Sequence, residues 1–263
     1  MNKRVLEVNH ATMRFGGLVA VNDLSMHIDH QEIVALIGPN GAGKTTAFNM
    51  ITGVYTPTEG SVTLSGRSIT GMRPDRIAAA GIARTFQNIR LFKAMTVLEN
   101  VKIAFTKDIH YNMLDSLLRT KKYWKTEQEL TERAMEYLRI VHLDGKADQL
   151  ASSLPYGQQR KLEIARALAT DMKLLLLDEP AAGMNPTETA ELLECINTIR
   201  DTFHVAILLI EHDMSLVMRV CERIQVINFG QTIASGYPAE IASNPEVIEA
   251  YLGEEEADED AEN

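Results

Sequence analysis

The chain has 263 residues, of which 45% are hydrophobic and 24% charged, and its formal net charge is −10. This composition is typical of a globular protein with one or two domains and excludes collagen-like and disulfide-scaffold proteins. Its two cysteines have no C-x-x-C spacing, so they indicate no thiolate metal site, and a reducing cytoplasm fits best. No apolar run approaches the roughly 18 residues of a membrane span, and the first residues lack the apolar segment of a secretory signal. We therefore expect a protein that does not cross a bilayer by itself.

Acidic residues are concentrated at the carboxyl end of the chain. Seven residues between 254 and 263 are acidic and none is basic, whereas the remaining chain is nearly balanced in charge. Such a segment has too little apolar surface to fold, so we expect 254–263 to be a solvated, disordered tail. An interaction tail is the alternative.

Short apolar runs predict strands near the start of the chain. They cover residues 5–8, 24–28, 33–37 and 60–66, and the run at 33–37 ends at a glycine-rich segment. From about residue 88 to 168 the pattern becomes mostly helical, with apolar residues that recur at helical spacing.

Strand-like runs return in the last third of the chain, at 174–177 and 205–210. A helix from about 186 to 202 separates them, with Asn185 as its predicted N-cap and Glu188 three residues later. Because strands and helices alternate and the strands are continuously apolar, we predict a buried parallel sheet. The helical segment at about 88–168 would be a subdomain inserted into this α/β core.

One glycine-rich segment matches the phosphate-binding pattern G-x-x-x-x-G-K-[ST] at every defined position. It follows the predicted strand at 33–37 and precedes a helical run at 46–51, which places a bound anion at a helix N-terminus. Lys44 can reach the β- and γ-phosphates, and the Thr45 hydroxyl can ligate magnesium. The predicted nucleotide contacts are Gly38, Pro39, Asn40, Gly41, Ala42, Gly43, Lys44, Thr45 and Thr46.

Two carboxylates follow the four leucines at 174–177. They are placed at the carboxyl end of a buried strand, where open α/β sheets bind ligands. Asp178 would hold magnesium through its water shell, and Glu179 would accept a proton from the attacking water. Together with the glycine-rich loop, this pair predicts a site for ATP and Mg²⁺.

Further motifs resemble those of ABC-type ATPases, in the order that this family shows. Leu154-Pro155-Tyr156-Gly157-Gln158-Gln159-Arg160 resembles the family's signature before the second acidic motif. The segment 181–185 resembles the loop after that motif. The resemblance covers roughly residues 5–252. It implies a P-loop NTPase core with a mostly parallel sheet, an antiparallel β subdomain and an inserted helical subdomain, all within a domain at 1–253.

The resemblance also implies roles for single residues. Phe15 would stack on adenine, His212 would contact the γ-phosphate, and Gln87 would ligate magnesium and sense the transmembrane partner. The signature residues Tyr156, Gly157 and Gln158 would bind the nucleotide of the opposite subunit, so turnover would need a dimer. The implied catalytic residues are Lys44, Gln87, Glu179 and His212, and the implied metal ligands are Thr45, Gln87 and Asp178.

Three positions depart from the wider family pattern. Pro155 stands in place of the signature serine, Tyr156 in place of the first glycine, and Asn185 where many members have aspartate. Proline cannot make the hydrogen bond to the γ-phosphate that the family assigns to the serine. Pro155 is compatible with a position in the first helical turn, where a missing N–H has no cost.

Within the ABC family, the chain most resembles the ATP-binding subunits of branched-chain amino-acid importers. The segments that carry this resemblance are 88–100, 179–186 and 250–253. The insert at 105–126 resembles that of the longer, G-type subunit. This likeness implies an ATP-hydrolysing subunit, peripheral on the cytoplasmic side of the inner membrane. Its partners would be permease subunits and a second ATPase subunit, either itself or a paralogue. The ATPase of another ABC transporter, such as a lipopolysaccharide-type system, is the alternative.

A basic cluster with aromatic residues lies in the insert. A nucleic-acid site is disfavoured there because the whole chain is acidic and no wider basic stripe is present. We expect a solvated helix with an aromatic residue packed inward, and no direct membrane insertion. The cluster consists of Arg119, Lys121, Lys122, Tyr123, Trp124 and Lys125.

Two other classes of ATP-binding protein fit less well. Soluble ABC ATPases of nucleic-acid repair or translation typically carry a coiled coil or tandem ATPase units, and this chain has no heptads and no internal repeat. A non-hydrolysing regulator would lack the base or the switch histidine, and the sequence has both Glu179 and His212.

Overall fold

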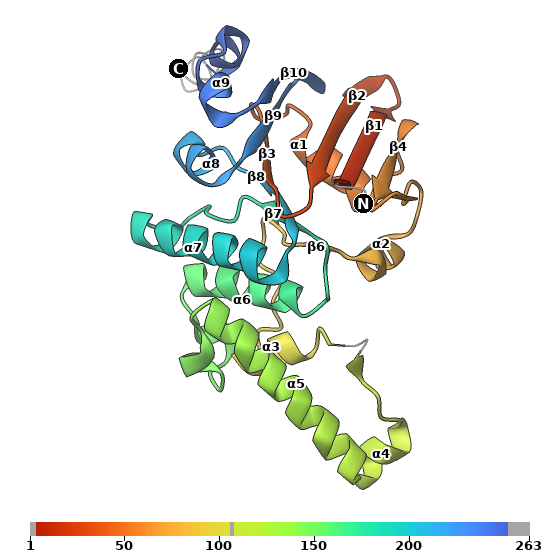
Figure 1. Cartoon of the computed structure of the whole chain (residues 1–263), viewed down its shortest axis with the longest axis vertical. Helices are drawn as coiled ribbons and strands as arrows, with labels where there is room; N and C mark the ends of the chain where they lie inside the picture. Colours follow the sequence, from red (N-terminus) through yellow and green to blue (C-terminus); the bar gives the residue numbers. More distant parts are fainter. Residues whose placement is uncertain (1–3, 106–107, 252–263) are drawn as a thin grey trace. The chain divides into compact units, whose positions relative to one another are not determined.

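A computed structural model describes residues 4–105 and 108–251 (Figure 1). The chain forms two compact units. Unit 1 comprises the described parts of residues 1–84, 173–179 and 200–263, and unit 2 those of 85–172 and 180–199. The predicted tail at 254–263 lies outside the described residues.

Unit 1 contains a six-stranded sheet with the order β10-β9-β3-β8-β7-β6. All neighbouring strands are parallel except β10, which pairs antiparallel with β9. Every residue of β3, β7 and β8 is buried, which explains their continuous apolar sequences. The predicted mostly parallel sheet is confirmed. Its strands are β3 (Ile33–Ile37), β6 (Ile82–Arg84), β7 (Leu174–Asp178), β8 (Ala206–Ile210), β9 (Arg223–Asn228) and β10 (Gln231–Gly236).

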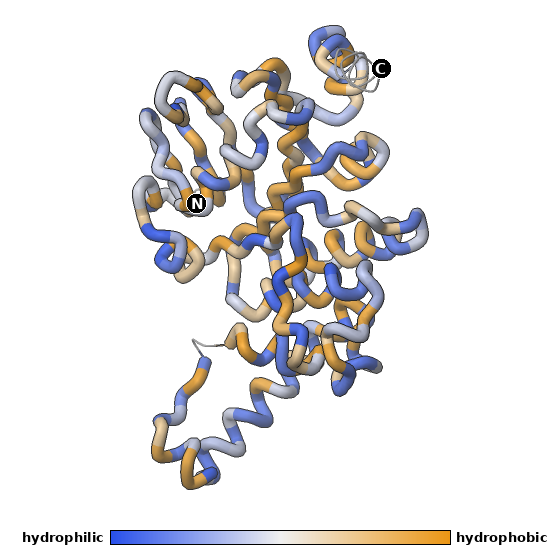
Figure 2. Tube along the Cα trace, turned by 180° about the vertical axis from the view of Figure 1, so that it is seen from behind, coloured by the Kyte–Doolittle hydropathy of each residue, from blue (hydrophilic) through white to orange (hydrophobic). Residues whose placement is uncertain are grey.

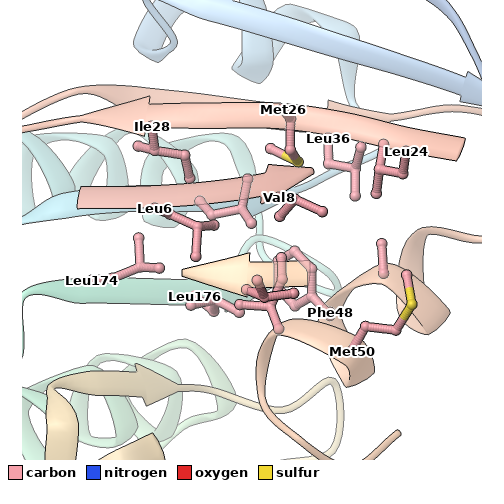
Figure 3. Close-up of a cluster of buried hydrophobic side chains, with 14 of the residues drawn as sticks. Leu6, Val8, Leu24, Met26, Ile28, Leu36, Phe48, Met50, Leu174 and Leu176 are labelled. Atoms are coloured by element: carbon pink, nitrogen blue, oxygen red, sulfur yellow. The ribbon is translucent and has the colours of Figure 1, made fainter. Parts of the chain in front are cut away.

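A second, antiparallel sheet in unit 1 has the order β2-β1-β4-β5. Its strands are β1 (Arg4–Phe15), β2 (Leu18–Asp29), β4 (Glu59–Leu64) and β5 (Arg67–Ser68). Apolar side chains from this sheet, from the parallel sheet and from α1 (Lys44–Ile51) form one buried cluster. Figure 3 shows Leu6 and Val8 of β1 near Leu176 of β7 and Phe48 of α1. This sheet is the predicted antiparallel β subdomain.

Unit 2 is helical. Its core is formed by apolar side chains of α3 (Val97–Lys102), α5 (Lys121–Ile140) and α6 (Tyr156–Leu168), among them Val101, Leu138 and Leu162. The short helices α2 (Pro74–Ala80), α8 (Met214–Val220) and α9 (Pro238–Ala242) belong to unit 1. The described helices of unit 2 are α3 (Val97–Lys102), α4 (Met113–Leu118), α5 (Lys121–Ile140), α6 (Tyr156–Leu168) and α7 (Pro186–Phe203), of which α7 belongs to this unit as far as residue 199. Two 3₁₀ turns lie at Asp144–Lys146 and Ala151–Ser153.

Helix α7 begins where its sequence predicts. Asn185 Oδ1 accepts hydrogen bonds from the N–H groups of Thr187 and Glu188, both at 3.0 Å. The Asn185 N–H donates to Glu188 Oε2 at 3.1 Å, which completes a capping box. Within the described residues, no helix is both long enough and apolar enough to span a bilayer.

Candidate nucleotide-binding site

Three neighbouring strands of the parallel sheet end at one edge. Strand β8 lies between β3 and β7, and Ile210 of β8 is in register with both Leu36 of β3 and Asp178 of β7. The glycine-rich loop, Glu179 and the loop with His212 follow these three strand ends directly. This carboxyl edge is where parallel α/β sheets bind their ligands, so the fold brings these predicted residues together.

The glycine-rich loop has a backbone that only glycine permits. Gly38 is buried, and a Cβ atom there would overlap the carbonyl oxygen of Ile227. Gly43 has φ +105°, and a Cβ atom there would lie 2.6 Å from the Ala20 carbonyl oxygen. The loop therefore passes close to β2 and β9, which fixes the direction of its N–H groups.

Helix α1 starts directly after the loop and has the features of an anion-binding N-terminus. Its N-cap, Gly43, offers no side-chain cap, and the first turn contains no acidic residue. The first N–H groups of a helix have no partner within the helix, so a phosphate can accept from them, and the helix dipole favours its negative charge. The Thr45 side chain lies in this turn, at an exposed position suited to a metal ligand.

Lys44 folds back over its own loop. Its Nζ donates to the carbonyl oxygens of Gly38 at 2.5 Å and of Pro39 at 2.8 Å, and the residue is buried. The ammonium group is thereby held at the loop, where a phosphate can replace these neutral acceptors with stronger, charged ones.

Asp178 forms an ion pair with Arg84 at the end of the neighbouring strand β6. Arg84 Nη2 donates to Asp178 Oδ2 at 2.8 Å, and both side chains are only 9% exposed. Arg84 Nη1 also donates to Asn49 Oδ1 at 2.8 Å, and the guanidinium group lies over the ring of Phe48. Because Asn49 and Phe48 hold the guanidinium group in place, its hydrogen bond to Asp178 favours one orientation of the carboxylate.

The role of Arg84 has almost no signal in the sequence. The only local signal is an arginine after two apolar residues, Ile82 and Ala83, in a strand of three residues. Such a strand is too short for a periodic pattern, so the contact with Asp178 follows from sheet order alone.

Glu179 is held in a left-handed backbone conformation, with φ +46°. Its N–H donates to the Ile210 carbonyl oxygen at 2.9 Å, which links it to strand β8. A non-glycine residue in this region costs on the order of 1–3 kcal/mol, and such residues cluster at functional sites. The conformation turns the half-buried Glu179 away from the path of β7, at the sheet edge where the loop begins.

His212 lies on the loop between β8 and α8. Its imidazole is exposed, and its Nδ1 lies 4.0 Å from Oε2 of the buried Glu211. The next residue, Asp213, caps α8 by accepting hydrogen bonds from the N–H groups of Ser215 at 2.8 Å and Leu216 at 3.3 Å. The imidazole is therefore accessible on a loop that a helix cap anchors.

Phe15 closes strand β1 and is exposed. Its ring packs edge-on against Tyr55, with ring centroids 5.1 Å apart. Tyr55 follows α1, and its N–H donates to the Asn49 carbonyl oxygen at 3.0 Å, so the pair of rings is fixed to that helix. An exposed, supported ring suits stacking on a planar base, as the resemblance implies.

The signature residues open helix α6 in unit 2. Pro155 is the N-cap, with φ −54° and ψ 155°, so our prediction of a first-turn position was wrong by one residue. The helix starts with Tyr156, and Pro155 provides no side-chain cap. A Cβ atom on the buried Gly157 would lie 2.8 Å from Glu188 Oε1, so a larger residue there would displace the end of the Glu188 side chain. Gln158 accepts a hydrogen bond from Lys146 at 2.7 Å.

Gln87 lies in a loop of unit 2 that Arg160 of α6 holds. The buried Arg160 guanidinium donates to the carbonyl oxygens of both Phe86 and Gln87. Arg160 Nη1 also lies 3.5 Å from Oε2 of the buried Glu163, which accepts the Arg90 N–H at 3.2 Å. Burial raises the pKa of the Glu163 carboxyl group, against the lowering effect of these partners. The signature helix and the Gln87 loop therefore share one buried polar network, which no local sequence pattern predicts.

We expect Arg160→Met to lower the free energy of unfolding by about 3–5 kcal/mol, because it removes the buried positive charge beside Glu163 and the donor to two backbone carbonyls. Urea unfolding measures this loss. Arg139→Met is the matched control, since Arg139 is exposed on α5 of the same unit, and a change within about 0.5 kcal/mol is expected there. Equal losses in both variants would contradict the role of the network.

Magnesium fits this site as an ion shared with phosphates. The described residues contain no group of three or more histidine, cysteine or acidic side chains that could hold a metal ion by themselves. Magnesium usually takes one or two protein ligands together with substrate phosphates and water. The hydroxyl of Thr45 and the carboxylate of Asp178 suit that role.

Comparisons with known proteins identify the family. The model of a family described as "ABC transporter" matches residues 21–182. The chain belongs to the ABC transporter family. A second model, described as "Branched-chain amino acid ATP-binding cassette transporter", matches residues 231–257. ABC transporter ATPases hydrolyse ATP to drive transport, so the predicted enzyme class is confirmed.

Individual relatives cover nearly the whole chain. The high-affinity branched-chain amino acid transport ATP-binding protein BraF of Pseudomonas aeruginosa is 48% identical over 97% of this chain and 100% of its own length. Its counterpart LivG of Salmonella typhimurium is 49% identical with the same coverage. A solved ATP-binding cassette of an ABC transporter in its ADP conformation is 32% identical, with a TM-score of 0.83 over 95% of this chain and 99% of that one. The predicted fold class and likeness to branched-chain cassettes are confirmed.

Proposed function

We propose that this ABC ATPase binds ATP with Mg²⁺ at the shared edge of β3, β8 and β7 and powers an importer of branched-chain amino acids. The observation that carries the ATPase site is the convergence of the phosphate loop, Asp178 and Glu179 at that edge. The cargo assignment is supported by the names of the relatives and by the family model at 231–257.

Catalysis at this site would rest on positioning and electrostatics. Lys44 exchanges its two carbonyl acceptors for the β- and γ-phosphates, and the N–H groups of α1 bind the phosphate oxygens. When bound, magnesium supplies charge neutralisation at the phosphates. Glu179 accepts a proton from the attacking water, and the exposed His212 donates a hydrogen bond toward the γ-phosphate.

A second subunit would complete each site. The N-terminus of α6 carries Tyr156, Gly157 and Gln158 and has no acidic residue in its first turn, which suits contact with a partner's ATP. Gln87 remains our proposed link to magnesium and to the permease. We infer that the working form is a dimer with itself or a paralogue, docked on permease subunits at the cytoplasmic face of the membrane.

The cargo proposal is tested by isolating the transporter from membranes and reconstituting it in vesicles with ATP inside. We expect uptake of leucine, isoleucine and valine that depends on hydrolysable ATP. The main alternative is the ATPase of another ABC transporter, such as a lipopolysaccharide-type system. ATP-dependent movement of a lipid, without uptake of these amino acids, would replace our proposal with that alternative.

Pro155→Ser is expected to strengthen ATP-dependent dimerisation in a non-hydrolysing Glu179→Gln background. A serine at this N-cap accepts a backbone hydrogen bond, worth about 0.5–2 kcal/mol, and its hydroxyl donates to the partner's γ-phosphate. Losing the proline restraint costs about 0.4–1 kcal/mol. Sedimentation with and without Mg-ATP should show dimer affinity raised by about tenfold, since a hydrogen bond to a charged group contributes about 1.5–3 kcal/mol.

Pro155→Ala is the matched control, because it removes the proline restraint without adding a hydroxyl. We expect no gain in dimer affinity for this variant. An unchanged or weaker Pro155→Ser dimer would mean that the proline signature works without the serine contact. Gly157→Asp is a less clean test, since its carboxylate would also face the Glu188 side chain of α7.

A further inference from the structure

Helix α4 carries four apolar side chains that the rest of the described chain leaves uncovered. Met113, Leu114, Leu117 and Leu118 are 89%, 67%, 77% and 72% exposed, and no residue of α4 is buried. Within unit 2, α4 lies at the end of α5 that points away from α6 (Figure 1). Figure 2 shows hydrophobic residues at this tip. Exposed apolar groups that cluster in this way mark an interaction surface.

The surrounding segment is held in place by polar contacts. Asn112 and Asp115 form a capping box at the start of α4. Tyr111 donates a hydrogen bond to Glu127 of α5 at 2.8 Å, and its ring packs edge-on against Tyr123. The hydrogen bond to Glu127 raises the pKa of the Tyr111 phenol to about 12, as expected for a donor held by a carboxylate. The polar contacts therefore attach the segment to α5 and leave the apolar side chains turned outward.

Basic side chains follow the apolar ones directly. Arg119 ends α4 and lies over the ring of Trp124, 5.9 Å from its centroid, and Trp124 is itself 56% exposed. The inward-packed aromatic residue expected in this insert is the half-buried Tyr123, whereas Trp124 is exposed. The α4 surface is defined by these exposed residues: Met113, Leu114, Leu117, Leu118, Arg119, Lys121, Lys122, Trp124 and Lys125.

We propose that the α4 surface docks on the anionic phospholipid surface of the membrane. This short segment combines apolar side chains, a tryptophan and several basic residues. Segments with this combination bind to the charged interface of a bilayer. The chain as a whole has a net charge of −10 and would be repelled by anionic lipid, so this local basic group provides the charge complementarity. The proposal depends on membership of a membrane transporter family and not on the cargo.

Charge also distinguishes lipid from the two protein partners. Cytoplasmic loops of membrane proteins carry an excess of lysine and arginine, so a permease loop would repel the α4 surface. A second copy that used the same patch would bring like charges together, because a twofold contact pairs a surface with itself. Anionic lipid headgroups attract the basic residues and admit the apolar ones. The helix would lie on the bilayer and would not span it.

Trp124 provides a probe for this contact, because it is the chain's one tryptophan. The purified full chain would be mixed with vesicles of phosphatidylglycerol and phosphatidylcholine in equal parts, or of phosphatidylcholine alone. We expect a blue shift of the tryptophan emission and co-sedimentation with the anionic vesicles only. High salt should weaken both signals, because the basic residues act through screened charges.

Paired substitutions locate the contact. Lys121→Glu with Lys122→Glu should lower vesicle affinity by at least about 25-fold, since each basic residue near an anionic surface contributes about fivefold. Leu114→Ser with Leu117→Ser should also weaken binding, and neither pair should change the basal ATPase rate. The matched control is Arg73→Glu with Arg76→Glu, which makes the same change of charge at exposed positions of unit 1 and should retain binding within about twofold.

Three outcomes would overturn the proposal. The first is an unchanged tryptophan spectrum with anionic vesicles, and the second is an equal loss of binding in the Arg73 and Arg76 control. The third is an effect of the leucine pair on self-association or on co-purification of permease subunits without any effect on vesicle binding. That third result would assign the α4 surface to a protein partner.

Discussion

Glu179→Gln is expected to lower the rate of ATP hydrolysis by about 10²- to 10⁴-fold and to leave ATP binding intact. The range is the usual contribution of a positioned general base, and glutamine keeps the shape of the side chain while losing the proton acceptor. The backbone at this position has φ +46°, which glutamine tolerates as well as glutamate does, so the fold should not change. Steady-state ATPase assays and a direct ATP-binding titration measure the two effects.

Glu59→Gln is the matched control for the catalytic variant. Glu59 is an exposed glutamate on β4 in the same unit, and it lies outside the strand edge that forms the site. Its substitution should leave the hydrolysis rate unchanged. Full activity in Glu179→Gln would remove Glu179 from the role of base, whereas lost ATP affinity would indicate that its carboxylate supports the site structurally.

The central site could be predicted from sequence because its residues follow strong local patterns. Residues 33–37 form a continuous apolar strand, and a glycine-rich loop and a helix follow it directly. Asp178 and Glu179 likewise close a run of four leucines. When parallel strands end at one edge, such local patterns meet in space without any further information.

Contacts between distant segments could not be predicted in this way. Arg84 reaches Asp178 because β6 pairs with β7, and this pairing joins residues far apart in the chain. Arg160 reaches the carbonyl oxygens of Phe86 and Gln87 across a similar separation. A single arginine in a sequence gives no sign of which carboxylate or carbonyl it will meet, so both networks required the structure.

Local preferences also misplaced Pro155. Proline is favoured at the first position of a helix, which led us to place it inside the first turn. In the structure Leu154 is extended, as residues before proline usually are, and Pro155 itself keeps an extended ψ of 155°. The helix therefore begins one residue later, and the signature N–H groups start at Tyr156.

Lys44→Met, in the glycine-rich loop, is expected to have the second large effect, a loss of ATP affinity. The substitution removes the ammonium group that now contacts the carbonyl oxygens of Gly38 and Pro39. A charge-assisted hydrogen bond to phosphate contributes about 1.5–3 kcal/mol, so ATP affinity should fall by roughly tenfold to a hundredfold, with or without magnesium. A binding titration with and without a chelator measures both values.

Thr45→Val distinguishes the charge of Lys44 from metal binding in the same turn. Its hydroxyl is the proposed magnesium ligand, and valine keeps the shape of the side chain without the oxygen. ATP affinity in the presence of chelator should therefore stay unchanged, while the gain that magnesium provides should shrink. Thermal unfolding without nucleotide shows whether either variant disturbs the loop itself. Lys44→Met could instead bind ATP as tightly as the parent chain, both with magnesium and with chelator. This loop would then not be the phosphate site. In the described structure, Lys44 is the residue whose ammonium group is hydrogen-bonded to the loop carbonyls.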